Sequence, residues 1–278
     1  MVDNVRRDET RRDETPSPVS FSFGQNWAEF IATRFSDAIV DAAKKRLLDF
    51  LELPDLKGKY FLDIGSGSGL HSLAAFRSGA DRIVSFDLDP ASVATTTKLR
   101  DQFGSADRWE VLHGSALDKA FLARIEPADI AYSWGVLHHT GSMWEAVENA
   151  AKLAKPDGMF FVALYTTTPK SGYWLETKKR YNAGGELTKR WLEARYLMRH
   201  LLLPCAVKLR NPFRILRETR DRGMDYMTDV RDWLGGLPYE DATPQEVLRF
   251  GRNKLGMELI NIATGEACSE YLFRRLGH

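Results

Sequence analysis

One stretch constrains the fold of this chain more than any other, because an apolar run leads directly into three closely spaced glycines. Residues 60–64 read Tyr-Phe-Leu-Asp-Ile, glycines follow at Gly65, Gly67 and Gly69, and a helical pattern of apolar residues begins at Leu70. This order predicts a buried strand, a tight loop and a helix N-terminus. Glycines lack a Cβ, so the loop can bring backbone close to a ligand. The dinucleotide fingerprint would require glycine at position 70, so this loop fits a pyrophosphate less well.

Alternating strand and helix patterns follow this stretch. After the first strand at 60–64, further strands are expected at 82–86, 109–113, 128–134 and 159–165, and helices at 69–78, 90–103 and 142–154. Short connections between them predict a doubly wound parallel sheet. A last helix at 244–255, begun by Thr243 and Pro244, precedes two closely spaced strands at 257–263 and 269–275. That ending predicts a hairpin, and therefore one antiparallel edge strand in an α/β fold with seven strands and helices on both faces.

The chain divides into segments of different composition. We expect residues 1–18 to form a disordered tail and residues 19–56 to form N-terminal helices that pack on the core or act as a lid. Residues 57–169 are expected to form a ligand-binding core, and residues 170–238 a helical insertion after strand five. Residues 239–278 should form the helix and strands that complete the core. The tail contains a direct repeat of Arg-Arg-Asp-Glu-Thr and has little to bury. The insertion is expected to contain helices at 173–181, 186–203 and 213–219, with Pro204 ending the second.

Composition excludes several classes of protein. The 278 residues carry a net charge of +1, so the whole molecule has no strong attraction to nucleic acid or an anionic membrane. No apolar run reaches the length of a spanning helix, and no signal-peptide pattern is present. The two cysteines, Cys205 and Cys268, make neither a disulfide framework nor a metal cluster. These features predict a soluble cytoplasmic protein without a metal site.

The insertion differs from the rest of the chain in charge. Positions 170 to 222 hold fourteen basic and five acidic residues, a net charge of +9, which leaves −8 for the remainder. A basic amphipathic helical segment has three interpretations here: a cap that pairs with the acidic remainder or with a second copy in a homodimer, a lid over an acidic or lipid-linked small molecule, or an RNA-binding face. Because no recognisable accessory RNA module accompanies it, RNA ranks last.

The carboxyl ends of the expected strands carry the residues most suited to binding. In open α/β sheets the ligand lies outside these ends, where the strand order reverses. Strand one ends at Asp63 and the glycine loop, and strand two ends near Asp87, whose carboxylate suits the two hydroxyls of a ribose. A loop containing Ser115 follows strand three, and Trp134 ends strand four.

Four motifs in order make the chain resemble a known family. They are residues 62–69 (Leu-Asp-Ile-Gly-Ser-Gly-Ser-Gly), 85–90 (Ser-Phe-Asp-Leu-Asp-Pro), 134–139 (Trp-Gly-Val-Leu-His-His) and 153–158 (Leu-Ala-Lys-Pro-Asp-Gly). Together they resemble the class I S-adenosylmethionine-dependent methyltransferases, with the small-molecule branch that includes ubiquinone and menaquinone methylases looking closest. The resemblance covers residues 57–165 and, more loosely, the last helix and strands. It implies a Rossmann-like fold with S-adenosyl-L-methionine as cofactor and S-adenosyl-L-homocysteine as product.

The resemblance also implies roles for individual residues. Gly65, Gly67 and Gly69 would lie under the methionine portion of the cofactor with Ser66 beside it, Asp63 would orient the loop and the cofactor's ammonium, Asp87 would bind the ribose, Leu88 would touch the adenine, Ser115 and Ala116 would flank it, and Trp134 would border the transferable methyl group. Many relatives have an acid where Ser115 stands.

Candidates for catalysis and acceptor binding come from the same edge of the sheet. His138 and His139 follow strand four and could act as a general base, although either could instead hydrogen-bond backbone. Tyr165 at the end of strand five, Trp27 in the N-terminal segment and Trp233 in a Gly- and Pro-rich loop are candidates to line the acceptor site, with structural packing as the competing role.

The sequence therefore predicts a methyltransferase that moves a methyl group by in-line displacement to an oxygen or nitrogen atom of a small-molecule acceptor. Within the same enzyme class, a tRNA- or RNA-modifying methyltransferase competes with this prediction. Outside methyl transfer, the sequence is also compatible with a non-catalytic S-adenosylmethionine-binding module or a dehydrogenase.

Overall fold

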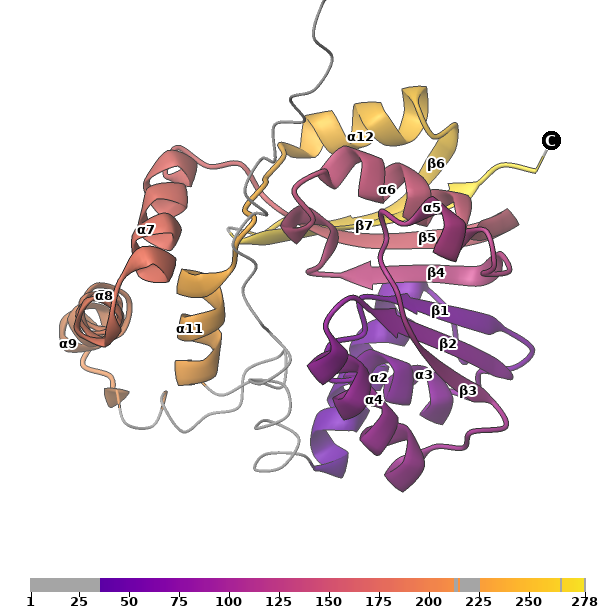
Figure 1. Ribbon diagram of the computed structural model, residues 1–278, viewed down its shortest axis with the longest axis horizontal. Coiled ribbons are helices and arrows are strands. Elements are labelled where there is room, and N and C mark those ends of the chain that lie inside the picture. Colours follow the sequence, from indigo (N-terminus) through magenta and orange to yellow (C-terminus); the bar gives the residue numbers. More distant parts are fainter. Residues whose placement is uncertain (1–35, 213–214, 216–225, 266, 278) are drawn as a thin grey trace, which may run out of the picture.

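A computed structural model describes residues 36–212, 215, 226–265 and 267–277. The expected tail, Trp27 and most of the helix expected at 213–219 lie outside the described residues. The chain forms a seven-stranded sheet in the order β3-β2-β1-β4-β5-β7-β6 (Figure 1). The predicted Rossmann-like α/β fold is confirmed.

The parallel part of the sheet consists of five strands. They are β1 (Tyr60–Ile64), β2 (Arg82–Asp87), β3 (Trp109–His113), β4 (Ala128–Trp134) and β5 (Ala154–Tyr165). Strand β1 pairs in parallel with β2 on one side and with β4 on the other. The strand order reverses at this point, so the carboxyl ends of β1 and β4 form the crevice where doubly wound sheets bind ligands.

Helices cover both faces of the sheet (Figure 1). One face packs against α2 (Asp37–Leu51), α3 (Leu70–Arg77) and α4 (Pro90–Phe103), and the other against α5 (Lys119–Leu122), α6 (Met143–Lys152) and α12 (Pro244–Asn253). Strand β1 serves both layers, because Leu62 belongs to one hydrophobic cluster and Phe61 to the other. Burial on both sides explains why β1 is an almost continuous apolar run.

The antiparallel pairing lies at the far edge of the sheet. Strand β7 (Cys268–Arg275) runs antiparallel to β5 and to the edge strand β6 (Met257–Ala263). Helix α12 precedes this hairpin and begins with a capping box, in which Thr243 and Glu246 bond each other's backbone N–H groups.

Strand β5 begins earlier than expected. The Pro-Asp-Gly sequence at 156–158 predicts a turn before the strand, whereas the structure has a bulge within it. Ala128 pairs with Ala154 and Ile130 pairs with Met159, so β5 contains extra residues between two registers. Asp157 lies in the left-handed region with a φ of 60°. The turn-forming residues therefore bend the strand without ending it.

The insertion after β5 is helical and has a hydrophobic cluster of its own. It contains α7 (Ser171–Ala183), α8 (Glu186–Leu197), a π-helical turn η2 (Met198–Leu202), α9 (Leu203–Val207) and α11 (Tyr226–Gly235). Its two connections to the core run side by side. Thr166 forms a bridge with Ala242, and the Ala242 N–H donates to the Tyr165 carbonyl at 3.0 Å.

Two expectations for the insertion are wrong. Pro204 does not end the helix, because the π-helical turn before it has already replaced the normal bonding pattern and the Leu203 N–H bonds to the Met198 carbonyl. Trp233 lies in the last part of α11 and not in a loop, since Gly235 is still helical. No helix in the described residues combines the length and apolarity needed to cross a membrane.

Candidate active site

The glycine loop adopts a backbone that side chains disfavour. Gly65, Gly67 and Gly69 have φ angles of 79°, 54° and 79°, all in the left-handed region. The Gly65 N–H donates to the Phe86 carbonyl at 2.8 Å and ties the loop to the end of β2. A Cβ built on Gly65 would lie 2.4 Å from a methyl carbon of Val136, which follows β4. All three positions favour glycine by backbone angle, and Gly65 is required by space as well.

Replacing Gly65 with alanine should lower the free energy of unfolding more than the same change at Gly58. Gly58 has a similar φ of 71°, but an added Cβ there meets nothing within 4 Å. The left-handed backbone alone costs about 1–2 kcal/mol for a non-glycine residue, and Gly65→Ala adds the contact with Val136. Chemical denaturation of both variants measures the difference. Equal losses would show that the loop gives way freely at Val136.

Asp87 supports the glycine loop from the end of β2. Its Oδ2 accepts the Gly67 N–H and its Oδ1 accepts the Asp89 N–H, each at 2.9 Å. Burial raises the pKa of this carboxyl above its usual value, while these two backbone bonds oppose the rise. Each carboxylate oxygen can accept a further bond. The next side chain, Leu88, is 64% exposed, so an apolar surface adjoins the acid.

Asp63 lies beneath the loop and is only 2% exposed. Its Oδ2 accepts the Ser72 hydroxyl at 2.5 Å, and Ser72 contacts the Ser85 hydroxyl at 2.7 Å. The Trp109 indole N–H also donates to Ser85. Burial is the main cause that raises the pKa of Asp63 to about 7. This polar chain ties β1 to the first turn of α3, directly after the glycine loop.

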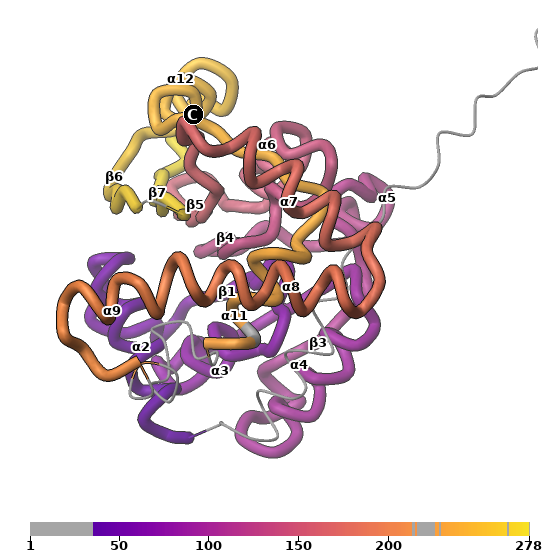
Figure 2. The backbone as a smooth tube through the Cα atoms, turned by 90° about the vertical axis from the view of Figure 1, so that its left-hand side faces the viewer, coloured from indigo at the N-terminus to yellow at the C-terminus, as the bar shows by residue number. Residues whose placement is uncertain are grey.

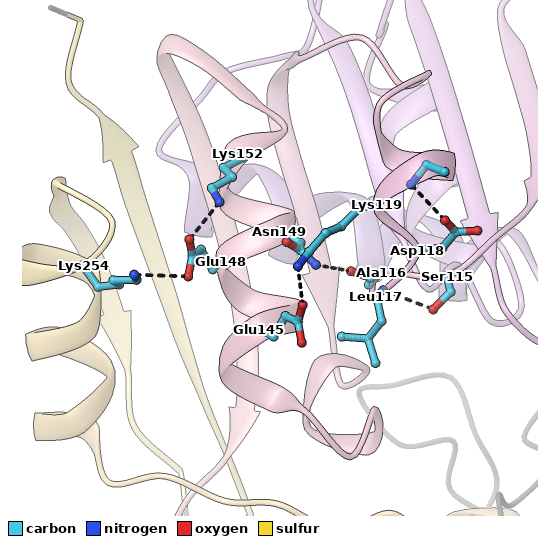
Figure 3. A network of polar contacts seen from close by, with 11 residues as sticks. Ser115, Ala116, Leu117, Asp118, Lys119, Glu145, Glu148, Asn149, Lys152 and Lys254 are labelled. Atoms are coloured by element: carbon cyan, nitrogen blue, oxygen red, sulfur yellow. Dashed lines mark hydrogen bonds and ion pairs between the residues drawn. The ribbon is translucent and has the colours of Figure 1, made fainter. Parts of the chain in front are cut away.

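The loop after β3 is fixed by polar contacts with α6 (Figure 3). The Ser115 hydroxyl accepts the Leu117 N–H at 3.1 Å, and the Ala116 carbonyl accepts the Asn149 amide at 3.0 Å. Lys119 pairs with Glu145 of α6 at 2.8 Å. In the glycine loop, Ser66 contacts the Thr96 hydroxyl of α4 at 3.0 Å. The backbone that carries Ser115 and Ala116 is thus held in place before any ligand binds.

Trp134 points toward the face covered by α2. Its indole N–H donates to Glu270 Oε1 at 2.7 Å, and the same oxygen pairs with Arg46 at 2.6 Å. His71, from the first turn of α3, places its ring 5.9 Å from the Trp134 ring. A hollow on this face is lined by Ala43, Arg46, Leu47, Phe50, His71, Tyr132, Trp134, Phe161 and Glu270. Arg46 and Glu270 thereby fix the orientation of Trp134.

Four candidate residues meet in an aromatic cluster at the end of β5. The ring of His138 lies 3.8 Å from that of Tyr165, and His139 and Trp233 lie 5.1 Å and 5.3 Å from it. His138 is fully buried. His139 Nδ1 lies 2.7 Å from the Pro238 carbonyl. Because a carbonyl can only accept, Nδ1 carries the hydrogen, and Nε2 is the basic nitrogen of the neutral ring.

A lysine that sequence reasoning assigned to the basic surface lies inside this cluster. Lys178 of α7 is fully buried, donates to the Trp233 carbonyl, and lies 4.5 Å above the Trp233 ring and 5.6 Å from the Tyr165 ring. Burial lowers its pKa to about 7, although Asp232 opposes the shift. Lys178 therefore cannot contribute to a phosphate-binding face. Its spacing from Trp174 and Tyr181 could have revealed this, because residues three and four apart share a helix face.

The residues present fit S-adenosylmethionine. A left-handed glycine loop provides a cradle that a Cβ would fill, an acid that retains acceptor capacity stands at the end of β2, and an exposed leucine adjoins it. No group of His, Cys, Asp and Glu in the described part of the chain could hold a metal ion.

The fold and the glycine-loop site are those expected of the class I S-adenosylmethionine-dependent methyltransferases. The chain belongs to the methyltransferase domain family, whose sequence profile matches residues 34–213. The resemblance to this class is confirmed, and S-adenosyl-L-methionine is its cofactor.

Curated relatives agree with this family. Ribosomal protein L11 methyltransferase of Tolumonas auensis is 30% identical over 116 residues, which are 42% of this chain and 37% of that protein. The corresponding protein of Vibrio parahaemolyticus is 30% identical over 111 residues, or 40% of this chain and 35% of that protein. The chain thus spans little more than a third of these relatives.

Two solved structures share the fold. One is an O-methyltransferase family protein from Burkholderia thailandensis, with a TM-score of 0.54 and 16% identity over 94% of this chain and 65% of that chain. The other is magnesium protoporphyrin IX methyltransferase from Synechocystis PCC 6803 with bound SAH, with a TM-score of 0.51 and 12% identity over 90% and 93% of the two chains.

Proposed function

We propose that this protein transfers a methyl group from S-adenosylmethionine to an oxygen or nitrogen atom of a small-molecule acceptor. The observation that supports this most directly is the convergence of the glycine loop, Asp87 and the aromatic cluster at the carboxyl ends of β1, β2, β4 and β5. The donor would lie over β1 and β2, and the acceptor would lie between β4, β5 and the insertion.

The donor side of this site has the following proposed roles. The methionine portion lies on Gly65, Gly67 and Gly69 with Ser66 beside it, and Asp63 orients the loop and the ammonium. The ribose hydroxyls donate hydrogen bonds to Asp87. The adenine is covered on one side by Leu88 and flanked by Ser115 and Ala116, and Trp134 borders the methyl group. The pairing of Trp134 with Glu270 supports its role, because a held indole can restrict the approach of the acceptor to one line.

The chemistry required of the protein is mainly positional. When bound, S-adenosylmethionine supplies a methyl group that its sulfonium already activates. The protein's residues place the acceptor atom in line and exclude water. Tyr165 and Trp233, with ring centres 5.3 Å apart, would form an aromatic wall on the acceptor side. His139 is better placed than the fully buried His138 to take a proton from the acceptor, because its Nδ1 is anchored and Nε2 is the basic atom.

His139→Asn should lower turnover by about 100-fold or more if His139 is the base, with little change in cofactor affinity. The asparagine amide can replace the anchoring Nδ1–H bond to Pro238 but cannot take the proton, so the variant separates catalysis from packing. His138→Ala should act mainly on stability. Steady-state rates across pH, with cofactor binding by calorimetry, check both. Unchanged turnover in His139→Asn would remove the base role.

A protein acceptor is the second candidate. The curated relatives described above are named as methyltransferases of a ribosomal protein, which favours this candidate. The matched part covers less than half of this chain. Incubation of the purified chain with methyl-labelled S-adenosylmethionine and separate pools of phenols, amines, carboxylic acids, ribosomal protein and tRNA distinguishes the candidates.

Labelled product in a small-molecule pool, with release of S-adenosylhomocysteine, is the expected result. Label confined to ribosomal protein or tRNA would transfer the assignment to that acceptor. Cofactor binding without product in any pool favours a binding module. Preference for a nicotinamide nucleotide in calorimetry would contradict methyl transfer altogether.

A further inference from the structure

The helical run from α8 to α9 presents a row of apolar side chains to solvent. Along α8 and η2 the row consists of Leu187, Trp191, Met198 and Leu202, which are 84%, 52%, 49% and 38% exposed. Leu203, Val207 and Leu209 continue it with exposures of 53%, 82% and 93%. Figure 2 shows this run as a nearly continuous helix across the front of the insertion. The spacings of four, seven and four residues keep the first four side chains on one face of the helix.

The same run has a second apolar face, which is already occupied. Leu192, Leu201 and Cys205 are 1%, 3% and 4% exposed and belong to the cluster that also contains Tyr181 and Val230. Packing of the insertion is thus satisfied by this inner face. A surface helix of a water-soluble domain normally directs charged residues outward, so the outer row requires another explanation.

Basic residues accompany the exposed row. Arg190, Arg199, Lys208 and Arg210 are exposed, and none of them has an ion pair within the described residues. Arg195 lies 4.8 Å above the Trp191 ring. The two acids of the run are engaged elsewhere, since Glu186 lies 3.7 Å from Lys189 and Glu193 accepts the Tyr181 hydroxyl. The exposed surface of this run therefore combines aliphatic side chains, one tryptophan and cationic charge.

We propose that this outer face, from Leu187 to Arg210, binds the surface of an anionic lipid bilayer. Leucine and tryptophan side chains enter the boundary between headgroups and acyl chains, while arginine and lysine pair with lipid phosphates. Charge complementarity favours this occupant. An RNA ligand would use the cations but would leave the protruding aliphatic side chains in water, because RNA binding depends on phosphate contacts and stacking.

The position of the insertion relates the proposed lipid-binding face to the candidate active site. The insertion lies beyond the carboxyl ends of the parallel strands, with α8 and α9 on its outer side and α11 nearer the sheet (Figure 1). A bilayer against α8 and α9 would face the end of the molecule that carries the glycine loop and the aromatic cluster. The proposal does not depend on methyl transfer, and its test does not measure activity.

Co-sedimentation of the full chain with lipid vesicles tests the proposal. Vesicles of phosphatidylcholine and phosphatidylglycerol in equal parts should bind the chain, vesicles of phosphatidylcholine alone should bind it much more weakly, and added salt should reduce the binding. Replacing Arg190, Arg199, Lys208 and Arg210 with glutamine should lower affinity by about fivefold for each charge removed. A control with Lys45, Lys57, Lys119 and Lys152 replaced by glutamine removes as many cations from the core and should bind nearly as the native chain does.

A second variant tests the apolar row. Leu187→Gln combined with Trp191→Gln and Leu202→Gln should reduce vesicle binding at least tenfold while the circular dichroism spectrum and the affinity for S-adenosylmethionine stay unchanged, because these side chains are exposed. Equal binding to both kinds of vesicle, or loss of binding in the control but not in the four-charge variant, would overturn the proposal. So would concentration-dependent dimerisation that the apolar variant abolishes, or tight binding of tRNA in place of vesicles.

Discussion

Replacing Asp87 with alanine should weaken S-adenosylmethionine binding by about 1–3 kcal/mol, the usual range for hydrogen bonds to a charged group. The variant loses the proposed acceptor for the ribose hydroxyls and also leaves the Gly67 and Asp89 N–H groups without their acceptor. Both effects act on the donor site, since Gly67 belongs to the loop that carries the methionine portion. Isothermal calorimetry measures the change.

Two comparisons make this result specific. Asp87→Asn keeps one side-chain acceptor and should bind with intermediate affinity. Asp55 also accepts a backbone N–H, that of Lys57 at 3.0 Å, but lies before β1 at the opposite end of that strand. Asp55→Ala should therefore leave cofactor binding unchanged. If Asp87→Ala retained native affinity, another residue would have to bind the ribose.

The second large effect concerns stability, and it comes from the buried Lys178. Its pKa is about 7 in the folded chain against an ordinary value of 10.5, so between these values the unfolded chain binds more protons than the folded chain. Stability should rise with pH through this window, by up to about 1.4 kcal/mol per pH unit. Below pH 7 lysine is protonated in both states, and the full penalty of burying its charge applies.

The difference between native protein and Lys178→Met isolates this contribution. Methionine carries no charge, so the stability of the variant relative to the native protein should be greatest at and below pH 7. This difference in stability should decrease progressively toward pH 10. The groups that face Lys178 are Asp232, the rings of Tyr165, Trp233 and Tyr239, and, more remotely, Cys268. Denaturant unfolding at several pH values gives the slope.

Lys179→Met is the matched control for this experiment. Lys179 is the next residue in α7, but its side chain is 56% exposed and pairs with Glu176 at the surface. Its replacement should leave the pH dependence as in the native protein. If the free energy of unfolding of Lys178→Met changed with pH in parallel with that of the native protein, Lys178 would titrate as an exposed lysine does.

The proposed donor half of the site could be predicted from the sequence, because its residues lie in short stretches at the ends of the predicted strands. Strands β1, β3 and β4 lie where the sequence predicts them. The signal is clearest for β1, since parallel strands covered on both faces need nearly continuous apolar sequence. The glycines follow directly from the tight turn after β1. Strand order then brings the ends of β1, β2 and β4 together, and Asp87 meets Gly67 there without any further assumption.

The proposed acceptor half could not be predicted in the same way, because it depends on packing between distant segments. Lys178 is one of many cations in the insertion, and only the approach of Trp233 and Tyr165 shows that it is buried. A proline normally ends a helix, but the π-helical turn before Pro204 accommodates the proline ring. Trp134 donates a hydrogen bond to Glu270, which lies 136 positions later in the sequence, and no local sequence pattern predicts this contact.

The bridge between Thr166 and Ala242 has a consequence for how such proteins diversify. It brings the two ends of the insertion to adjacent positions on the core, so the whole segment can be lengthened, shortened or replaced without changing the register between β5 and β7. Chains tolerate exchange of segments whose ends lie close together. If the insertion selects the acceptor, as proposed, exchanging residues 170–238 between related enzymes should change the acceptor preference and leave donor binding unchanged.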